Sequence, residues 1–366
     1  MKKKIAFIKY CGATAGGTEK YLQTIAANLD KSKFEVDFYF SGPAKLIGTK
    51  YTHQEPNPKR IDYLKKNGVN LIEFSVEKID YSNKEKVVWI NTNFWKVFNE
   101  DKYDLIQIAR SGKNEYPYNK IKKVPIIDSI HIPWGAEDSE NVVNVLIQSN
   151  DLKNKWIEYG GNKEKIVTNC TPIDEKKILN KNLRTQLELE NYFIFGLHQR
   201  KDDHIFSDVP LISYSKIESS RTAFLIMGGS SKYSEQAKKL KIKNFFQIEF
   251  DFQDNSEEVF LNTLDVFTHG RKDGETFGLA IAEAMRNSLP IVSHKNVYNN
   301  AHIETISSGG KVVGSQRMYT FELIKLMYLK KYYNHRMKNS RNIYLNNFES
   351  KKKIKEIEDI YLKAAR

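Results

Sequence analysis

The chain is poor in cysteine and has no long apolar run. Cys11 and Cys170 are its two cysteines in 366 residues, which excludes a disulfide framework and a cysteine-based metal site. No apolar run approaches the roughly 18 residues of a membrane span. The start, MKKKIAFIKY, is basic but lacks the long apolar region of a signal peptide. We therefore expect a protein of a reducing cytoplasm.

Charge is present in excess but is unevenly spread. The net charge is +13, and residues 1–185 carry +8 of it, with 31 Lys and Arg against 23 Asp and Glu. Residues 186–329 carry −2 and residues 330–366 carry +7. A basic surface attracts phosphates, anionic lipid headgroups or nucleic acid, although a solvated lysine-rich surface is the simpler alternative. Because no usual nucleic-acid-binding motif is present, we expect no nucleic acid partner.

The most informative stretch runs from residue 264 to 294. It begins with a short apolar run, 264–267, as expected for a buried parallel strand. A polar loop with two glycines follows at 269–275, and strong helix formers occupy 277–287. The helix therefore begins just past the carboxyl end of a strand, where open α/β sheets bind ligands. Its N–H groups and dipole favour an anion there, typically a phosphate.

Two carboxylates flank this predicted anion site. Glu275 lies in the loop and Glu283 lies within the helix. Carboxylates form strong hydrogen bonds with hydroxyl groups, so a ligand that carries both phosphates and hydroxyls, such as a nucleotide sugar, fits the pair. The simpler alternative is that Glu283 is a solvated helix-face residue and Glu275 a loop charge.

Apolar strands and helical patterns alternate along the whole chain, which favours parallel doubly wound sheets. A chain of this length accommodates two domains. An amphipathic stretch at 87–98 carries Trp89 and Trp95, for which core packing is the simplest interpretation. The strands expected are 5–10, 36–40, 69–74, 103–108, 124–130, 142–149, 192–196, 222–227, 245–250, 264–267 and 291–293, and 41–58 is expected to be a long loop.

The sequence GETFGLAIAEAM, followed by LPIV at 289–292, resembles the signature of retaining family-4 glycosyltransferases, or glycosyl transferases group 1. The resemblance implies the GT-B fold, in which two Rossmann-like doubly wound parallel-sheet domains face each other across a cleft. We expect an acceptor domain at 1–180 and a nucleotide-sugar donor domain at 190–340. A helix at 341–366 is expected to cross back to the first domain.

The resemblance also implies roles for the residues of the signature. Glu275 is expected to contact the donor sugar and to be catalytic, and Glu283 to contact the nucleotide ribose. The backbone between them is expected to meet the sugar and the phosphates. This donor-binding backbone comprises Thr276, Phe277, Gly278 and Leu279.

Two glycine pairs extend the resemblance. Gly16 and Gly17, in GGTE, resemble the Gly-Gly-x-Glu start of the family, which lines the cleft near the donor phosphates and the acceptor. These glycines do not form the G-x-G-x-x-G fingerprint of dinucleotide binding. Gly228 and Gly229 follow a strand, and resemble the strand-to-glycine turn beneath the nucleotide.

One basic segment departs from the family pattern. Relatives have an arginine directly after a glycine and a lysine several residues later, both on the diphosphate, whereas this chain has Leu197 after that glycine. We assign the diphosphate contacts to Arg200 first and to Lys201 second, because arginine suits bidentate phosphate binding. The alternative is a solvated basic pair that faces Asp202 and Asp203.

His131 follows the strand predicted at 124–130. A lone histidine is more often structural. Its position resembles that of a family histidine beside the donor sugar, so we expect it to hydrogen-bond the sugar or to stabilise charge in the transition state. Trp134 and Glu137 are weaker candidates for the acceptor side. The segment 166–174 resembles the end of the first domain in this family, with Cys170 in place of the usual glycine.

These features predict a mechanism. No Asp-x-Asp triple is present, so we expect no metal and assign stabilisation of the leaving group to Arg200, Lys201 and the helix N-terminus. The resemblance implies retention of configuration, with no dedicated base and no cofactor beyond a UDP- or GDP-sugar donor. The acceptor is expected to be a glycan or lipid-linked, in polysaccharide synthesis. The basic first domain and tail favour a peripheral contact with an anionic membrane.

Three alternatives remain open at this stage. An inactive GT-B scaffold or binding protein would keep the fold without turnover. A nucleotide-sugar epimerase on the same fold would need an acid/base set around the sugar, which is not evident. A glycogen-type phosphorylase would need a pyridoxal lysine, and no lysine stands out for it.

Overall fold

The computed structural model describes residues 2–49, 55–168, 171–174, 181–249 and 256–366. It divides into two compact units. The first comprises Met1–Asp174 and Ser350–Arg366, and the second Glu175–Glu349. In the part of the chain that is described, no helix has the length and apolar character needed to cross a membrane.

The main sheet of the first unit has seven parallel strands. They are β1 (Lys3–Ile8), β2 (Phe34–Ser41), β4 (Asn70–Phe74), β7 (Leu105–Ile108), β9 (Ile126–Ile130), β10 (Val142–Ile147) and β11 (Ile166–Thr168). Their order is β11-β10-β9-β7-β1-β2-β4. The chain thus starts in the middle, builds one side, and then returns to build the other. The order reverses between β1 and β7, and doubly wound sheets bind ligands at the carboxyl ends of such a pair.

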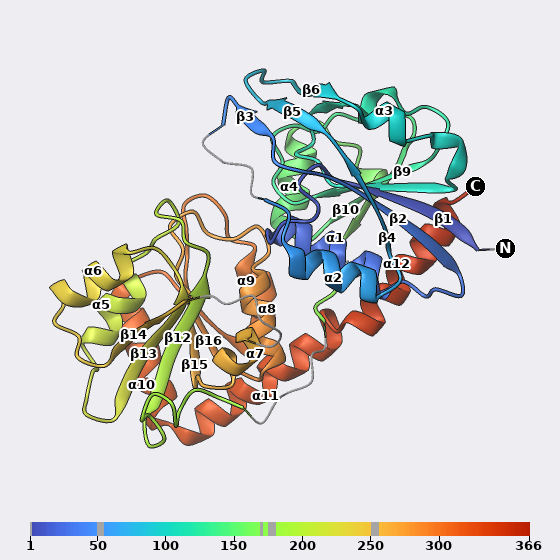
Figure 1. Cartoon of the computed structure of the whole chain (residues 1–366). Helices are drawn as coiled ribbons and strands as arrows, with labels where there is room; N and C mark the ends of the chain where they lie inside the picture. Colours follow the sequence, from blue (N-terminus) through green and yellow to red (C-terminus); the bar gives the residue numbers. More distant parts are fainter. Residues whose placement is uncertain (1, 50–54, 169–170, 175–180, 250–255) are drawn as a thin grey trace. The chain divides into compact units, whose positions relative to one another are not determined.

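Apolar cores cover both faces of this sheet. Figure 1 shows α1 (Gly17–Asn28) and α12 (Ser350–Ala364) on one face. Ile354, Ile357 and Tyr361 of α12 recur at helical spacing and are buried there. The Tyr361 hydroxyl donates to Oε1 of Gln107 at 2.7 Å, so the last helix is bonded to the centre of the sheet. The unit also contains α2 (Pro58–Lys66), α4 (Asn150–Glu158) and short 3₁₀ turns at Glu100–Lys102, Tyr118–Lys120 and Lys163–Lys165.

A small mixed sheet on the other face was not predicted. It consists of β3 (Lys45–Ile47), β5 (Val76–Asp80), β6 (Lys86–Thr92) and β8 (Asn114–Tyr116). The amphipathic stretch is therefore strand β6 followed by the single turn of α3 (Phe94–Val97). Trp89 is buried and stacks on Phe74, as core packing requires, but Trp95 is 38% exposed, so that expectation was wrong for Trp95.

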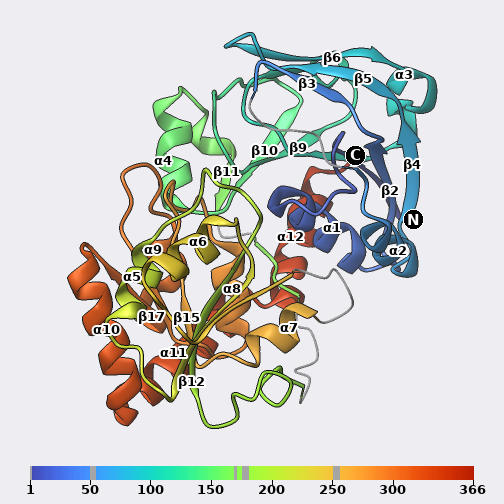
Figure 2. The same ribbon diagram turned by 60° about the vertical axis from the view of Figure 1, so that its left-hand side comes forward.

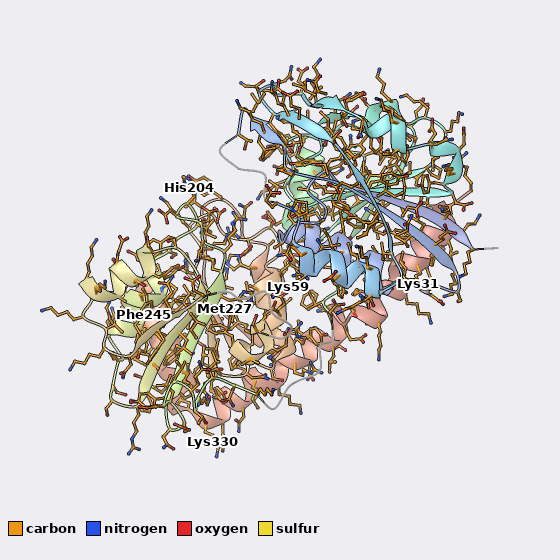
Figure 3. All side chains as sticks on the ribbon, viewed as in Figure 1. Lys31, Lys59, His204, Met227, Phe245 and Lys330 are labelled. Atoms are coloured by element: carbon orange, nitrogen blue, oxygen red, sulfur yellow. The ribbon has the colours of Figure 1, made fainter. Side chains whose placement is uncertain are left out.

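The second unit holds six parallel strands. They are β12 (Phe193–Gln199), β13 (Thr222–Gly228), β14 (Phe245–Ile248), β15 (Val266–Thr268), β16 (Ile291–His294) and β17 (Gly310–Val313), in the order β14-β13-β12-β15-β16-β17. This is again a doubly wound order, which reverses between β12 and β15. Met227, labelled in Figure 3, lies near the carboxyl end of β13, and Phe245 begins β14. The prediction of two doubly wound parallel sheets is confirmed.

Helices flank this second sheet. They are α5 (Val209–Ser215), α6 (Lys232–Lys239), α7 (Ser256–Leu261), α8 (Leu279–Arg286), α9 (His302–Ile306), α10 (Gln316–Tyr328) and α11 (Lys330–Asn347), with a 3₁₀ turn at Ser307–Gly309. Helix α10 packs beside α5, as Figure 2 shows, and α11 packs against α8. The chain leaves this unit after α11 and enters the first unit at Ser350. Helix α8 is thereby fixed between the sheet and α11, with its first turn at the carboxyl edge of the strands.

Candidate active site

The loop between β15 and α8 fixes the position of Glu275. Gly274 has φ +69°, and a side chain there would place its Cβ 1.9 Å from the carbonyl oxygen of Asn299, so only glycine fits. Glu275 forms a parallel β-bridge with Asn300, and its carbonyl accepts from the N–H of Ala301 at 3.1 Å. The loop is therefore held against the segment that follows β16.

The Glu275 carboxylate meets two basic side chains. The Nε2 of His269 lies 3.2 Å from its Oε1, and Nη1 of Arg271 lies 3.5 Å from both of its oxygens. Burial alone would raise the pKa of Glu275, but the charge of Arg271 and the bond from His269 hold that pKa down, to about 2. Glu275 is thus ionised, and its carboxylate accepts hydrogen bonds but is a poor proton carrier.

Arg271 was missed from the sequence. Its Nε and Nη2 donate to the two oxygens of Asp273 at 2.7 and 2.9 Å, which leaves Nη1 toward Glu275. Although burial opposes its charge, these carboxylates raise the pKa of Arg271 above its ordinary value. The sequence signal was the run RKDGE, where one arginine stands two residues before an aspartate and four before Glu275 in the same loop.

The first turn of α8 presents backbone N–H groups. Gly278, with φ +97°, is the N-cap, and no described side chain caps it. A Cβ at Gly278 would lie 2.9 Å from Cδ1 of Ile281, and L side chains rarely adopt this φ. The helix starts at Leu279, two residues later than predicted. The carbonyl of Phe277 accepts a hydrogen bond from Thr305 Oγ1 at 2.6 Å, so its partner lies outside the helix. This helix end suits an anion.

Glu283 is 3% exposed, so the alternative of a solvated helix-face residue was wrong for it. His198, near the end of β12, places its Nε2 3.4 Å from Oε2 of Glu283. Nearby, Nη2 of the buried Arg286 donates to Glu257 at 3.3 Å and to Glu258 at 2.7 Å. Two clusters of charged side chains therefore lie around α8. One surrounds Glu275 on the loop before the helix, and the other is buried beside Glu283 and Arg286.

One group of described residues has donor atoms close enough for a metal ion. Ligand atoms of His198, Glu257 and Glu283 lie within 4.8 Å of one another. The guanidinium of Arg286 already compensates the charge of Glu257. We therefore assign no metal to this group.

Arg200 and Lys201 lie on the surface. Strand β12 runs to Gln199, three residues beyond its predicted end, because Leu197 is buried and pairs with Ile226 of β13. Arg200 is therefore the first residue after the strand. Its guanidinium donates to Asp202 at 2.8 and 3.1 Å, while Lys201 pairs with Glu249. Both pairs are exposed, as the alternative of a solvated basic pair predicts. The partner of Lys201 differs from that alternative, because it is Glu249 and not Asp202 or Asp203.

The predicted glycine turn lies beside that strand end. Gly228 and Gly229 have φ of 70° and 71°. The N–H of Gly229 donates to the carbonyl of Gln199 at 2.6 Å. The turn is also fixed by Gln247, whose Nε2 donates to the carbonyl of Gly228 at 2.8 Å. The structure therefore brings these glycines next to Arg200.

In the first unit, Gly16 is the N-cap of α1 and Gly17 its first residue. A Cβ at Gly16 would lie 2.0 Å from Oε2 of Glu19, so the glycine makes room for this carboxylate. Glu19 is buried and accepts from Sγ of Cys11 at 3.0 Å. The loop after β1 is thereby tied to the first turn of α1.

His131 lies at the carboxyl end of β9, as predicted. Its ring contacts Tyr21 of α1 edge to face, with centroids 4.7 Å apart. Its Nε2 is buried and has no hydrogen-bond partner among the described residues. Burial, helped by the charge of Lys9, lowers the pKa of His131 to about 3. The imidazole is therefore neutral at physiological pH.

The two weaker acceptor-side candidates differ. Trp134 is 38% exposed, with Nζ of Lys113 5.5 Å from its ring centroid. Glu137 instead accepts from Nη1 of Arg110 at 3.1 Å, and Arg110 is also paired with buried Asp128 at 2.7 Å. Glu137 thus has a structural partner. Cys170, in the segment that resembles the end of the first domain, lies outside the described residues.

Two doubly wound parallel sheets, each in its own unit, define the GT-B class of fold, and solved structures agree. HepE from Anabaena, in complex with UDP and glucose, superposes with a TM-score of 0.71 at 15% identity, covering 98% of this chain and 99% of that one. Sucrose-phosphate synthase from Thermosynechococcus elongatus gives 0.71 at 13% identity, with 99% of each chain covered. WaaG, a glycosyltransferase involved in lipopolysaccharide biosynthesis, gives 0.66 at 15%, covering 97% and 99%.

Part of the second unit is similar in sequence to a known protein family. Residues 209–343, from α5 into α11, match the family described as glycosyl transferases group 1. The matched residues include Glu275, α8 and Glu283. A search of curated protein sequences found no match to the chain.

Proposed function

We propose that this protein transfers a sugar from a nucleoside-diphosphate sugar to an acceptor hydroxyl with retention of anomeric configuration. The observation that carries the proposal is the ionised Glu275 beside the uncapped first turn of α8, at the edge where the doubly wound order reverses. This arrangement offers an anion site and a hydroxyl site side by side. The UDP and glucose bound by HepE are a ligand pair with these two chemistries.

In the proposed complex, the donor diphosphate meets the N–H groups of α8, with Arg200 and Lys201 as further charges. Glu275 accepts hydrogen bonds from the donor sugar, and Glu283 accepts them from the ribose. The bond between sugar C1 and the phosphate oxygen breaks as the acceptor oxygen attacks C1 from the same face. The acceptor proton passes to a donor phosphate oxygen, so no protein base is required. Leaving-group charge is stabilised by the helix end and the two cations, and the proposal includes no metal.

The acceptor is proposed to be a glycan or a lipid-linked glycan in polysaccharide synthesis. The basic first unit supports an anionic or membrane-associated acceptor, because α12 displays exposed Lys351, Lys352 and Lys355. WaaG, with the same fold, acts in lipopolysaccharide biosynthesis. Co-sedimentation with vesicles that contain anionic lipid, at low and high salt, tests the peripheral contact. Absence of binding at both salt concentrations would dismiss it.

A donor panel tests the central proposal. Purified protein is screened with UDP-, GDP-, ADP- and CMP-sugars by thermal shift, and slow release of the nucleotide is then followed. We expect stabilisation by one nucleotide family, and release that is lost in Glu275→Gln. No stabilisation and no release with any donor would contradict the proposal and favour an inactive GT-B scaffold.

A further inference from the structure

Among the described residues, several buried polar atoms without a hydrogen-bond partner gather at the carboxyl edge of the first unit's sheet. His131 directly follows β9 and Gln148 directly follows β10. Ile130 and Ile147, the residues before them, are register partners in adjacent parallel strands. Because adjacent strands lie about 4.8 Å apart and paired residues face the same side, the two polar side chains start next to each other.

Gln148 is the most unusual of these side chains. It is 4% exposed, yet neither its Nε2 nor its Oε1 has a hydrogen-bond partner among the described residues. The Nε2 of His131 is likewise buried and unpartnered. An amide that loses its water without gaining a partner destabilises the fold, and native proteins leave few such groups. An amide left unpaired at both ends therefore calls for a functional reason.

A third member comes from the loop after β7. The buried Oγ of Ser111 also has no partner in the described part of the chain. The carbonyl of Ser111 accepts from the N–H of Trp134 at 2.7 Å, which ties this loop to the segment that follows His131. Strands β7, β9 and β10 are neighbours in the sheet. The three side chains thus follow three neighbouring strands, on the edge where doubly wound sheets bind ligands.

None of the three side chains carries a charge. The Gln148 amide offers a donor and an acceptor, a serine hydroxyl offers both, and a neutral imidazole nitrogen offers one or the other. Sugar hydroxyls both donate and accept, so they match this set, whereas a phosphate or carboxylate would meet no cation in it. Lys9, whose charge acts on His131, is engaged: its Nζ donates to the carbonyl of Ala109 at 2.8 Å.

We propose that Gln148, together with His131 and Ser111, forms a sugar-binding site at the carboxyl ends of β7, β9 and β10. This inference rests on the proposed function, and it adds that the first unit recognises a neutral, hydroxyl-rich ring through Gln148. The ring belongs either to the donor or to the acceptor, since both present the same hydroxyl chemistry.

Gln148→Met tests the site, because methionine has a similar volume and no amide. The control is Ser213→Ala in α5 of the second unit, where a hydroxyl that is 0% exposed also lacks a partner among the described residues. We expect Gln148→Met to melt at the same temperature as the wild type or higher, since an unpaired group is removed. We also expect it to lose at least tenfold in kcat/KM, while Ser213→Ala keeps wild-type kinetics.

Two reactions identify which sugar is bound. In donor hydrolysis without an acceptor, a raised KM in Gln148→Met assigns the site to the donor sugar. Unchanged hydrolysis with slower transfer to methyl α-glucoside, galactoside or mannoside assigns it to the acceptor. UDP affinity is expected to be unchanged in either case. Equal kinetics for Gln148→Met and wild type in both reactions would overturn the site.

Saturation-transfer NMR with the same methyl glycosides separates this inference from the proposed function. A wild-type protein that turns over no donor contradicts the proposed function. The site is then decided by the NMR alone. Glycoside signals that are present in wild type and lost in Gln148→Met sustain it, and signals that are equal in both proteins or absent from both overturn it.

Discussion

The His269 ring lies between Glu275 and Ser293: its Nε2 is 3.2 Å from Oε1 of Glu275, and its Nδ1 is 2.8 Å from Oγ of Ser293. A carboxylate only accepts, so Nε2–H donates to Glu275, while Nδ1 faces the serine hydroxyl. Tyr319 fixes the same residue by donating to the carbonyl of His269 at 3.0 Å. The orientation of Glu275 is therefore set by buried groups on and beside the sheet, and the behaviour expected of Glu275 and Arg271 variants depends on it.

Glu275→Gln is expected to lower turnover more than nucleotide binding. The isosteric amide keeps the size of the side chain but loses charge-assisted bonds to the sugar, each worth about 1.5–3 kcal/mol, so kcat should fall roughly 10- to 100-fold. The Kd for the free nucleotide diphosphate should change by less than about twofold, since that ligand has no sugar ring to lose contacts. Parallel kinetics and calorimetry test this. Equal losses in turnover and in nucleotide affinity would show that Glu275 does not contact the sugar.

Arg271→Met is expected to move the acid limb of the pH–rate profile to higher pH. The charge of Arg271 helps to hold the pKa of Glu275 at about 2, below its ordinary value of 4.5, so the carboxylate is now lost only as pH falls through about 2. Without that charge the pKa rises, and ionised Glu275 is lost at a higher pH. In kcat/KM measured between pH 4 and 8, we expect the variant to lose activity at the acid end while the wild type does not, and equal profiles would mean that Arg271 does not act through Glu275.

Arg200→Met tests the assignment of the diphosphate. An exposed arginine that is paired with Asp202 has little structural role, so the fold should keep its melting temperature. If Arg200 leaves Asp202 to bind the donor, UDP affinity should fall about tenfold, the loss of one charge-assisted contact of about 1.5 kcal/mol. Binding of uridine, which lacks phosphates, is the control. Unchanged UDP affinity would show that Arg200 belongs to a solvated surface pair and does not bind the diphosphate.

Arg286→Met is expected to destabilise the second unit strongly. The substitution leaves Glu257 and Glu258 buried without their cation, a change that costs about 3–5 kcal/mol. All four tryptophans of the chain lie in the first unit, so tryptophan fluorescence should change little. Hydrogen exchange of peptides from α8 and β16 should instead lose protection, and Arg200→Met serves as an exposed control. Unaltered protection would show that the two glutamates find another partner.

His131→Gln is expected to reduce the slope with which the unfolding free energy of the first unit rises with pH. The pKa of His131 is lowered to about 3, so between about pH 6.5 and 3 the unfolded chain binds a proton that the folded chain does not. Stability therefore rises with pH over this range, and glutamine should remove up to about 1.4 kcal/mol per pH unit of that slope.

Urea unfolding at several pH values between 4.5 and 7.5, followed by tryptophan fluorescence, measures this slope for the first unit. Substitution of the exposed His204, labelled in Figure 3 on a loop of the second unit, is the control for loss of a histidine. An equal slope in His131→Gln and wild type would contradict the prediction.

The sequence predicted the strands of the two main sheets except β11 (Ile166–Thr168) and β17 (Gly310–Val313), because apolar runs of four to eight residues between polar turns have few other solutions. It also placed Glu275 in the loop after the right strand, but it started the following helix two residues too early, at Phe277. The small sheet of β3, β5, β6 and β8 was missed, because it pairs short strands from distant segments, and β3 lies in what was expected to be a loop.

The chemistry of the site was less predictable. Arg200 and Arg271 both stand in loops that follow a strand, yet Arg271 meets Glu275 while Arg200 lies on the surface. Each arginine begins a nearly identical run, RKDD and RKDG, and the local difference is Glu275, four residues after Arg271. The approach of His198 to Glu283 joins residues 85 positions apart, through the neighbouring strands β12 and β15 and the helix that follows.

The sequence by itself determined the class of fold and the position of the loop and helix that carry Glu275 and Glu283, because alternation of apolar residues, glycine turns and helix formers acts over a few neighbouring residues. Only the tertiary structure decided which charges pair and which polar atoms stay unpaired. Those outcomes depend on strand register and loop packing, as with Gln148, whose neighbour His131 is set by the pairing of β9 with β10.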